Sequence, residues 1–249
     1  MSISQKVRHR VHAKRPLQLF SFDQMVHKDE NHSAIAKELS RLYSNGVINR
    51  LKPGVYYKPK ESRFGNLKPS ENDILKYLLF EKGKRIGYVS GMRLYNGLGL
   101  TSQVSGVIEV ASNESKRSFV LAGLRIRYIK AYGRIDKDDL LLMQLLDVIK
   151  DLNRIPDARI NESLHLVSQK VVQLSLEKQR ELVKVAAKYP ARVKALVGAM
   201  MAKIWERKPL EKELLVNLRK EIVNTSRFQF PIASSILHNT SKWNIYEPA

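Results

Sequence analysis

Residues 31–58, NHSAIAKELSRLYSNGVINRLKPGVYYK, hold the pattern that decides the fold of the N-terminal part of the chain. We predict a helix from about Ser33 to Tyr43, because apolar residues recur there every three or four positions. Asn31 or Ser33 would cap its start, since a short polar side chain can accept a hydrogen bond from a helix N–H group that has no other partner. Asn45-Gly46 would end the helix, because glycine tolerates the left-handed turn at a helix C-terminus.

A β-hairpin is expected directly after this helix. Val47 to Leu51 and Val55 to Lys58 read as strands on either side of the turn Lys52-Pro53-Gly54. Upstream, the spacing of Ile3, Val7 and Val11 predicts a first helix. A short second helix, started by Ser21, is predicted from its apolar residues Phe20, Phe22, Met25 and Val26. Three helices followed by two strands is the order of a winged helix-turn-helix, which we assign to residues 1–63.

The third predicted helix can be tested as a recognition helix by rotating each residue about 100°. With Ile35 at the centre of the buried face, Leu39 and Leu42 fall beside it, and Glu38 lies near the core edge. Short polar or cationic side chains then occupy the opposite face, which carries no acid: Ser33, Lys37, Ser40, Arg41 and Ser44. A helix that enters the DNA major groove needs this arrangement, although any amphipathic helix also has a solvated polar side.

Further cations flank this face. Asn49, Arg50 and Lys52 on the hairpin could reach a phosphate or the adjacent minor groove. Lys28 and His32 lie close to the helix N-terminus, where backbone N–H groups already favour a phosphate. We expect Lys28, Arg50 and Lys52 to fix position by charge, and Lys37, Ser40 and Arg41 to read base edges. Contact of Arg41 with a guanine is the first base contact that we expect.

The charge of the chain favours a polyanionic partner. Lys and Arg number 44 against 24 Asp and Glu, a formal net charge of +20, and residues 1–63 hold 13 of the basic residues against 5 acidic ones. Such an excess favours nucleic acid ahead of a membrane surface. The chain has no cysteine, which excludes disulfide scaffolds, zinc fingers, iron–sulfur sites and thiol catalysis. No apolar run approaches the length of a membrane span, so we expect a soluble protein.

The first 22 residues allow two interpretations. They contain five Lys or Arg and no acid, as a mitochondrial transit peptide would. The buried stripe of Ile3, Val7 and Val11 instead favours the first helix of a domain. We adopt the second interpretation, which favours a bacterial, cytoplasmic protein.

Residues 64–135 are expected to form a small α+β domain. Ser70 would cap a helix through Phe80, and Ser90 would cap a helix through Asn96 after a strand at Ile86 to Val89. Further strands are predicted at Val107 to Ala111, Phe119 to Leu121 and Ile126 to Ile129.

Residues 136–249 are expected to form a helical region with an irregular tail after Asn224. Asp138 and Asp139 would stand at the start of its first helix, where the helix dipole favours acids. Two apolar stripes predict later helices, one from Val193 to Ile204 and one made by Leu210, Leu214, Leu218 and Ile222. Such helices must pack on each other as a bundle. The predicted fold class is therefore α+β and mostly helical.

Several stretches resemble a known family, the AbiEi-type antitoxins of type IV toxin–antitoxin systems. They are AKELSRL at 36–42, NGVI at 45–48, PGVYY at 53–57, Ser90-Gly91, and GLGLTSQV at 97–104. The resemblance covers residues 1–135; beyond these it extends to helical character and the ending Trp243-Asn244-Ile245. Many repressors share a winged helix, so the Gly-Leu-Gly-Leu-Thr-Ser-Gln loop is the more distinctive part. Its polar residues 101–103 could form a functional surface, but a helix C-cap and turn is the interpretation that we favour.

The resemblance implies a bacterial protein encoded beside a nucleotidyltransferase-like toxin. It implies repression of its own operon, through binding of inverted repeats by the winged helix. The C-terminal part would counteract the toxin, and in the type IV scheme this need not involve a stable complex. The long helical C-terminal region departs from the family pattern, which leaves the mechanism of neutralisation open.

A search for an enzyme finds little. The chain lacks a glycine-rich phosphate loop, a His-Glu-x-x-His motif and a Gly-x-Ser-x-Gly motif. The N-terminal histidines have no carboxylates at metal-binding spacing, so we predict no metal and no cofactor. Arg159 and His165, with Asn161 between them, resemble the spacing of helical HEPN ribonucleases.

The sequence thus predicts a non-enzymatic antitoxin and transcriptional repressor. Its expected partners are double-stranded operator DNA and a nucleotidyltransferase-like toxin, with no membrane. Two alternatives stay open: a nucleic-acid-binding regulator without a toxin partner, and a ribonuclease that uses Arg159 and His165.

Overall fold

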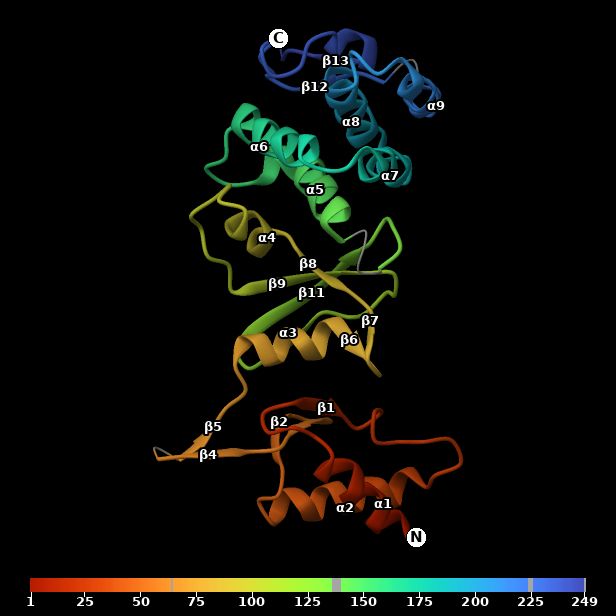
Figure 1. Ribbon diagram of the computed structural model, residues 1–249. Helices are drawn as coiled ribbons and strands as arrows, with labels where there is room; N and C mark the ends of the chain where they lie inside the picture. The colour runs from red at the N-terminus through yellow and green to blue at the C-terminus, as the bar shows by residue number, and fades with distance from the viewer. Residues whose placement is uncertain (64, 136–139, 224–225, 249) are drawn as a thin grey trace. The chain divides into compact units, whose positions relative to one another are not determined.

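The computed structural model describes residues 1–63, 65–135, 140–223 and 226–248 (Figure 1). The fold is α+β with helix predominating, as predicted. The chain divides into two compact units: Met1–Gly87 with Ser118–Ile126, and Tyr88–Arg117 with Arg127–Ala249. The predicted middle segment, 64–135, is therefore shared between both units.

The first unit begins with a small helical and β domain. Its elements in chain order are α1 (Ile3–His12), β1 (Leu19–Ser21), α2 (His32–Ser44), β2 (Asn49–Lys52) and β3 (Val55–Tyr57). The three strands form one antiparallel sheet in the order β1-β3-β2. Tyr56 of the central strand β3 lies opposite Phe20 of β1 on one side and opposite Arg50 of β2 on the other. A shared core lies between the helices and this sheet: Val7, Val11, Phe20, Met25, Ile35, Leu39, Leu42 and Ile48.

The predicted second helix, around Ser21, is wrong. Residues 19–21 form strand β1, and the following residues form turns. Phe20 is fully buried and its ring stacks on Tyr56. Pairing in the sheet therefore stabilises residues 19–21 more than one or two helical turns would, because a short helix is costly to nucleate. A turn therefore stands where the sequence predicted the second of three helices.

Arg10 holds that turn against α1. Its guanidinium donates to both carboxylate oxygens of Glu30, at 2.7 and 2.6 Å, and to the backbone oxygen of Met25 at 2.6 Å. A two-pronged contact of this kind is among the strongest side-chain interactions and fixes orientation as well as distance. The turn is therefore ordered by tertiary contacts instead of helical hydrogen bonds.

The rest of the first unit contains short hairpins and one helix. The elements are β4 (Lys60–Ser62), β5 (Gly65–Leu67), α3 (Glu71–Leu79), β6 (Phe80–Glu81), β7 (Lys84–Arg85) and β10 (Phe119–Leu121), which pairs with the first residues of β11 (Leu124–Lys130). Ser70 caps α3 as predicted, in a reciprocal pair of hydrogen bonds with Asp73. The β4–β5 hairpin was not expected from the sequence.

The second unit packs helices against a small sheet. Its elements are β8 (Tyr88–Ser90), α4 (Met92–Gly97), β9 (Val107–Ser112), α5 (Leu140–Asp151), α6 (Ile160–Val172), α7 (Leu176–Ala186), α8 (Ala191–Ile204), α9 (Lys212–Lys220), β12 (Phe228–Gln229) and β13 (Ile245–Tyr246). Strand order in the sheet is β10-β11-β9-β8. Helices α7 and α8 contact each other, and both contact α5 and α9, as the predicted bundle requires (Figure 1). No helix in the described ranges is long and apolar enough to cross a bilayer.

Two details of the second unit differ from the sequence prediction. Gly91, with φ 67°, is the N-cap of α4, because the Ser90 hydroxyl points inward and donates to Asp147 instead. In the last apolar stripe, Leu210 is 89% exposed, while Leu215, Leu218 and Ile222 are buried. The predicted helix start at Asp138 and Asp139 lies outside the described residues.

The C-terminal tail is fastened to α8 by Trp243. This ring is 6% exposed and lies against the backbone of Gly198, where a Cβ would overlap it. Arg219 donates to the backbone oxygen of Lys242 at 2.8 Å and to the side chain of Asn244 at 2.9 Å. The tail is thus part of the core of the second unit.

Replacing Gly198 with alanine is expected to destabilise the second unit by about 1–3 kcal/mol, the usual cost of overpacking a well-filled core. Gly97→Ala is the matched control, because Gly97 is also helical but has nothing within 4 Å of an added Cβ. That control should be neutral or slightly stabilising, since alanine favours helix. Urea unfolding followed by tryptophan fluorescence measures both, and an unchanged Gly198→Ala midpoint would contradict the described packing of the tail.

Candidate nucleic-acid interface

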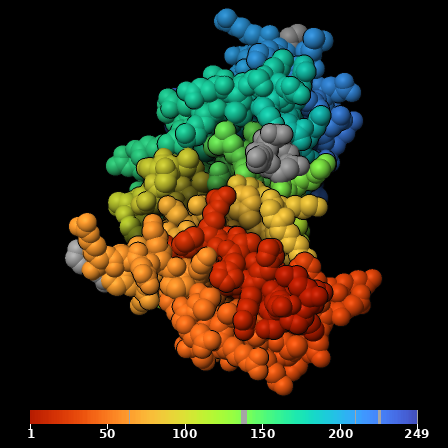
Figure 2. All heavy atoms as spheres, turned by 60° about the horizontal axis from the view of Figure 1, so that its bottom comes forward, coloured from red at the N-terminus to blue at the C-terminus, as the bar shows by residue number. Residues whose placement is uncertain are grey.

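Helix α2 presents the face that the sequence predicted. Ile35, Leu39 and Leu42 are buried against the core, while Lys37 and Arg41 are exposed on the opposite side. The three serines of that face, Ser33, Ser40 and Ser44, are exposed as well. Figure 2 brings this part of the chain forward, with α1 in red and α2 in orange.

The acid of α2 is turned inward. Glu38 is 2% exposed and accepts a hydrogen bond of 2.7 Å from Nε of Arg8 on α1. Its other oxygen lies 3.7 Å from Nη1 of Arg41. Burial raises the pKa of Glu38, but hydrogen bonds from Arg8 and Ser4 and the charges of Arg8 and Arg41 together hold it below its ordinary value. The carboxylate therefore stays charged and orients two cations whose side chains are 56% and 70% exposed.

A hollow of about 380 Å³ lies between α1 and the C-terminal half of α2. Arg8, His12, Ser40, Arg41 and Ser44 are among its lining residues. Sequence reasoning missed Arg8 and His12 as members of this face. The sequence could have paired them, because Arg8 and His12 are four residues apart on α1 and so lie on one face of it.

The β2–β3 hairpin brings one more cation to α2. The guanidinium of Arg50 on β2 lies 4.9 Å from the centre of the Tyr43 ring, and Tyr43 is 41% exposed at the end of α2. Asn49 is half-buried and donates weakly, at 3.5 Å, to the hydroxyl of Tyr57. An exposed cation stacked on an exposed aromatic ring offers both charge and a flat surface to a nucleic acid.

Lys52 is placed differently from the other predicted contacts. It is half-buried, and its Nζ lies 3.6 Å from the centre of the Phe119 ring in the β10–β11 hairpin of the same unit. Burial lowers the pKa of Lys52. Its ammonium is therefore engaged within the protein, which makes it a weaker candidate for a phosphate contact than Arg50.

The N-terminal end of α2 keeps the predicted polar groups at the surface. Asn31 is the cap, accepting a hydrogen bond of 3.1 Å from the N–H of Ala34, so Ser33 is not used for capping. Lys28 and His32 are exposed, and the His32 ring contacts the edge of Phe22. All ten predicted contact residues thus lie in the first unit; Asn49 and Lys52 are half-buried, and the other eight are exposed.

Comparisons with known proteins place the chain in a family. Residues 6–182 match the model described as "Family of unknown function (DUF6088)". The chain belongs to this DUF6088 family. No curated protein matches the sequence. The crystal structure of the RV2827C protein from Mycobacterium tuberculosis is similar at 10% identity and a TM-score of 0.47, covering 98% of this chain and 90% of that one.

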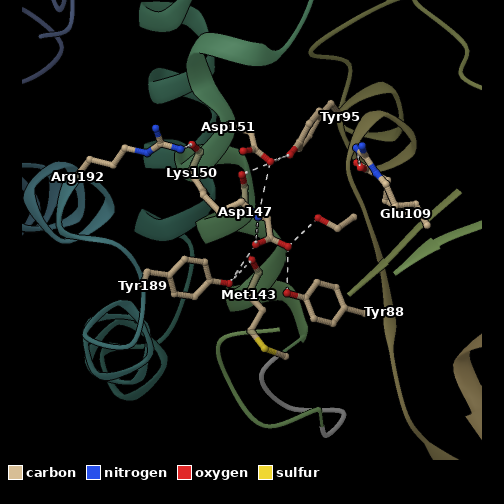
Figure 3. A network of polar contacts seen from close by, with 11 residues as sticks. Tyr88, Tyr95, Glu109, Met143, Asp147, Lys150, Asp151, Tyr189 and Arg192 are labelled. Atoms are coloured by element: carbon tan, nitrogen blue, oxygen red, sulfur yellow. Dashed lines mark hydrogen bonds and ion pairs between the residues drawn. The ribbon is translucent and has the colours of Figure 1, made fainter. Parts of the chain in front are cut away.

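The second unit holds a polar network that sequence reasoning did not find (Figure 3). At its centre is Asp147 of α5, which is fully buried. Its carboxylate accepts hydrogen bonds from Ser90 at 2.7 Å, Tyr88 at 3.0 Å and Tyr189 at 3.2 Å, and lies 3.1 Å from Nζ of Lys150. Burial and the charge of Asp147 raise the pKa of both tyrosines, so their hydroxyls stay protonated and donate.

The network continues one helical turn away. Tyr95 of α4 donates to Asp151 at 2.7 Å, and Lys150 lies 3.6 Å from the same carboxylate. Because Asp147 is closed to solvent and every oxygen of its carboxylate has partners, the network joins β8, α4, α5 and the end of α7 instead of offering a reaction site.

The Gly-Leu-Gly-Leu-Thr-Ser-Gln loop of this DUF6088 chain is fixed from within. Gly99, at φ 75°, ends α4 with its N–H bonded to the oxygen of Asn96. The Asn96 side chain donates to the backbone oxygens of Thr101 and Gln103, and the Gln103 side chain donates to Asp157 at 3.0 Å. These contacts agree with the helix C-cap and turn that the sequence favoured.

Arg159 and His165 each contact a different neighbouring side chain. Arg159 precedes α6 and pairs with Glu162 at 3.2 Å, while His165 contacts Gln169 at 2.9 Å. Asn161 bonds to the backbone of Pro231 and Ala233 and so fastens the tail. Among the described residues no group of three or more acids and histidines is placed to hold a metal.

The Arg10–Glu30 pair predicts how the first unit responds to acid. The hydrogen bond from Arg10 lowers the pKa of Glu30 from 4.5 to about 2. A carboxylate whose folded pKa is depressed stabilises the protein above its unfolded pKa, and that contribution is lost as the pH falls from about 4.5 towards 2. We expect Glu30→Gln to reduce stability at neutral pH and to remove this part of the acid response. Circular dichroism of thermal unfolding between pH 2 and 7 measures it.

Glu61→Gln is the control, because Glu61 is an exposed acid on β4 of the same unit. It should keep both the neutral stability and the acid response of the original protein. If the Glu30→Gln variant and the unsubstituted protein lost the same stability on acidification, the Arg10–Glu30 pair would not hold the turn.

Proposed function

We propose that this protein is a DNA-binding repressor that also serves as the antitoxin of a bacterial toxin–antitoxin pair. The observation that carries the DNA-binding part is the acid-free, cationic face of α2, with Glu38 buried behind it and Arg8 and Arg50 on either side. The antitoxin part rests on the resemblance to AbiEi-type antitoxins in the sequence. The protein would act without catalysis, in the bacterial cytoplasm.

The geometry supports separate roles for the cations. Lys37, Ser40 and Arg41 stand along the middle of the exposed face of α2, where a helix in the major groove contacts base edges. Arg8 and Arg50 flank that face, and Lys28 stands near the helix N-terminus, where phosphates of the two strands would pass. Lys52, stacked on Phe119, would contribute little.

Two kinds of variant should separate base reading from backbone binding. Arg41→Ala is expected to lower affinity for the protein's own promoter about tenfold and to spare non-specific duplex, because a guanine contact contributes about 1–3 kcal/mol of discrimination. Arg50→Ala should weaken both duplexes alike and make the slope of log K against log salt less negative by about 1. Fluorescence anisotropy at several salt concentrations measures both.

Arg159→Ala is the matched control, because it removes an exposed arginine of the second unit. It should leave DNA binding unchanged, and so, nearly, should Lys52→Ala. Equal losses from Arg41→Ala and Arg50→Ala on every duplex would refute the division of roles. Failure of the unchanged protein to bind its own promoter would refute the repressor itself.

Neutralisation of the toxin can be separated from repression in the full chain. The double variant Lys37→Ala/Arg41→Ala should lose repression of a promoter reporter, because it removes two cations from the reading face. Co-expressed with the product of the neighbouring toxin gene, the same variant should still rescue growth, since the resemblance assigns neutralisation to the C-terminal part. If the unsubstituted protein repressed the reporter but did not rescue growth, the result would favour a regulator that has no toxin partner.

A further inference from the structure

The first unit contains a second hollow, well away in sequence from the face of α2. It has a volume of about 810 Å³ and lies between residues 13–19, the loop after α1, and the segment formed by α3 and the β6–β7 hairpin. Sites for small molecules typically measure about 300–1,000 Å³. None of its lining residues belongs to the hollow beside α2.

The lining of this cavity is strongly cationic. Four basic residues face it: Lys14, Arg15, Lys76 and Lys82. The acid of the lining, Asp73, is already bonded to the N–H and hydroxyl of Ser70 at the start of α3. None of the four cations forms an ion pair with another residue of the described chain. The lining thus holds four cations against one carboxylate, with Asp23 and Glu81 close enough to Tyr77 to act on its hydroxyl.

Lys14 shows most clearly that a partner is missing. It is half-buried, and burial lowers its pKa. Its nearest described electrostatic contact is the Phe20 ring, 5.9 Å from Nζ. An ammonium that has lost part of its water and has no carboxylate nearby is stabilised by an anionic ligand.

The other side chains of the cavity suit an aromatic ligand. Tyr77 and Phe80 of the α3–β6 segment line it, and the guanidinium of Arg85 already lies 4.4 Å from the centre of the Phe80 ring. The side-chain oxygens of Gln18 and Gln24 accept hydrogen bonds from the backbone N–H groups of Arg15 and Ser21, at 3.1 and 3.2 Å. The NH2 groups of the two glutamines make no hydrogen bond to any other described residue and can donate to a base or a ribose.

The rim is held in one conformation before any ligand binds. Leu17, between the lining residues Pro16 and Gln18, has φ 64°, a left-handed conformation that residues other than glycine rarely adopt. A hydrogen bond of 2.8 Å from its N–H to the oxygen of Lys58 keeps it there. Strained backbone of this kind is found at ligand sites, where it positions neighbouring groups in advance.

We propose that this cavity binds a phosphorylated nucleoside. Its phosphates would lie among Lys14, Arg15, Lys76 and Lys82, its base would stack on Tyr77 or Phe80, and the glutamines would donate to its polar edge. The ligand is either a free nucleotide or a nucleotide within a single strand, since both present the same chemistry. The inference is independent of duplex binding by α2.

Isothermal titration calorimetry with the full chain tests this directly. The probes are the four ribonucleoside triphosphates, inorganic triphosphate, and a 5′-phosphorylated single-stranded pentanucleotide. We expect a nucleoside triphosphate or the pentanucleotide to bind, and whichever binds more tightly identifies the source. The double variant Lys14→Gln/Lys76→Gln should weaken that binding about tenfold or more, because each charge-assisted hydrogen bond contributes about one tenfold step.

A matched pair on one hairpin keeps the test specific. Lys82 lines the cavity, whereas Lys84, two residues on and equally exposed, does not. Lys82→Gln should weaken binding several-fold and Lys84→Gln should not. Three outcomes would each overturn the proposal. The first is an equal loss of affinity in Lys82→Gln and Lys84→Gln, and the second is equal affinity for inorganic triphosphate and the nucleotides. The third is that no nucleotide or pentanucleotide binds. Duplex DNA binding by Lys14→Gln/Lys76→Gln should persist, so a failed repressor test and a failed nucleotide test are distinguishable.

Discussion

The ion pair between the buried Glu38 and the exposed Arg8 is the interaction on which the N-terminal arrangement depends. It joins the two helices that enclose the core, and it takes the single acid of α2 out of the exposed face. A charged carboxylate inside a protein is tolerated only when it is paired and hydrogen-bonded. Arg8 and Arg41 offset the cost of burying Glu38 while their own side chains stay largely exposed. The contact that holds the helices together therefore also leaves the surface of α2 positive.

The second unit also contains a paired, buried carboxylate, but this one places no charge at the surface. Asp147 is also a buried carboxylate, but hydroxyl groups and Lys150 surround it on both oxygens. All of its partners lie inside, and no charge is directed to the surface. The exposure of the partners therefore distinguishes the two sites. Arginines with exposed ends pair with Glu38, whereas the hydroxyl groups that bond to Asp147 join helices and strands inside the unit.

The distribution of pairs also explains how a chain with a net charge of +20 folds. Many of its acids are used to secure arginines at joints, as Glu30 does for Arg10 and Glu211 does for Arg180. Two groups of cations in the first unit line hollows instead, one beside α2 and one at the cavity of Lys14. Both places combine positive charge with aromatic rings, which is the chemistry that nucleotides and nucleic acids recognise.

The sequence by itself determined the elements whose evidence is local. The spacing of Ile35, Leu39 and Leu42 fixed the buried side of α2, and the polar residue at its start and Asn45-Gly46 at its end set its limits. Ser70 as a cap followed from the same short-range chemistry. Only the tertiary structure decided that Phe20 lies in a strand, that Ser90 points to Asp147, that Lys52 stacks on Phe119 and that Arg8 joins the face of α2. Each of these depends on a partner far along the chain, and no local pattern of polarity records which distant side chain will complete a hydrogen bond or cover a ring.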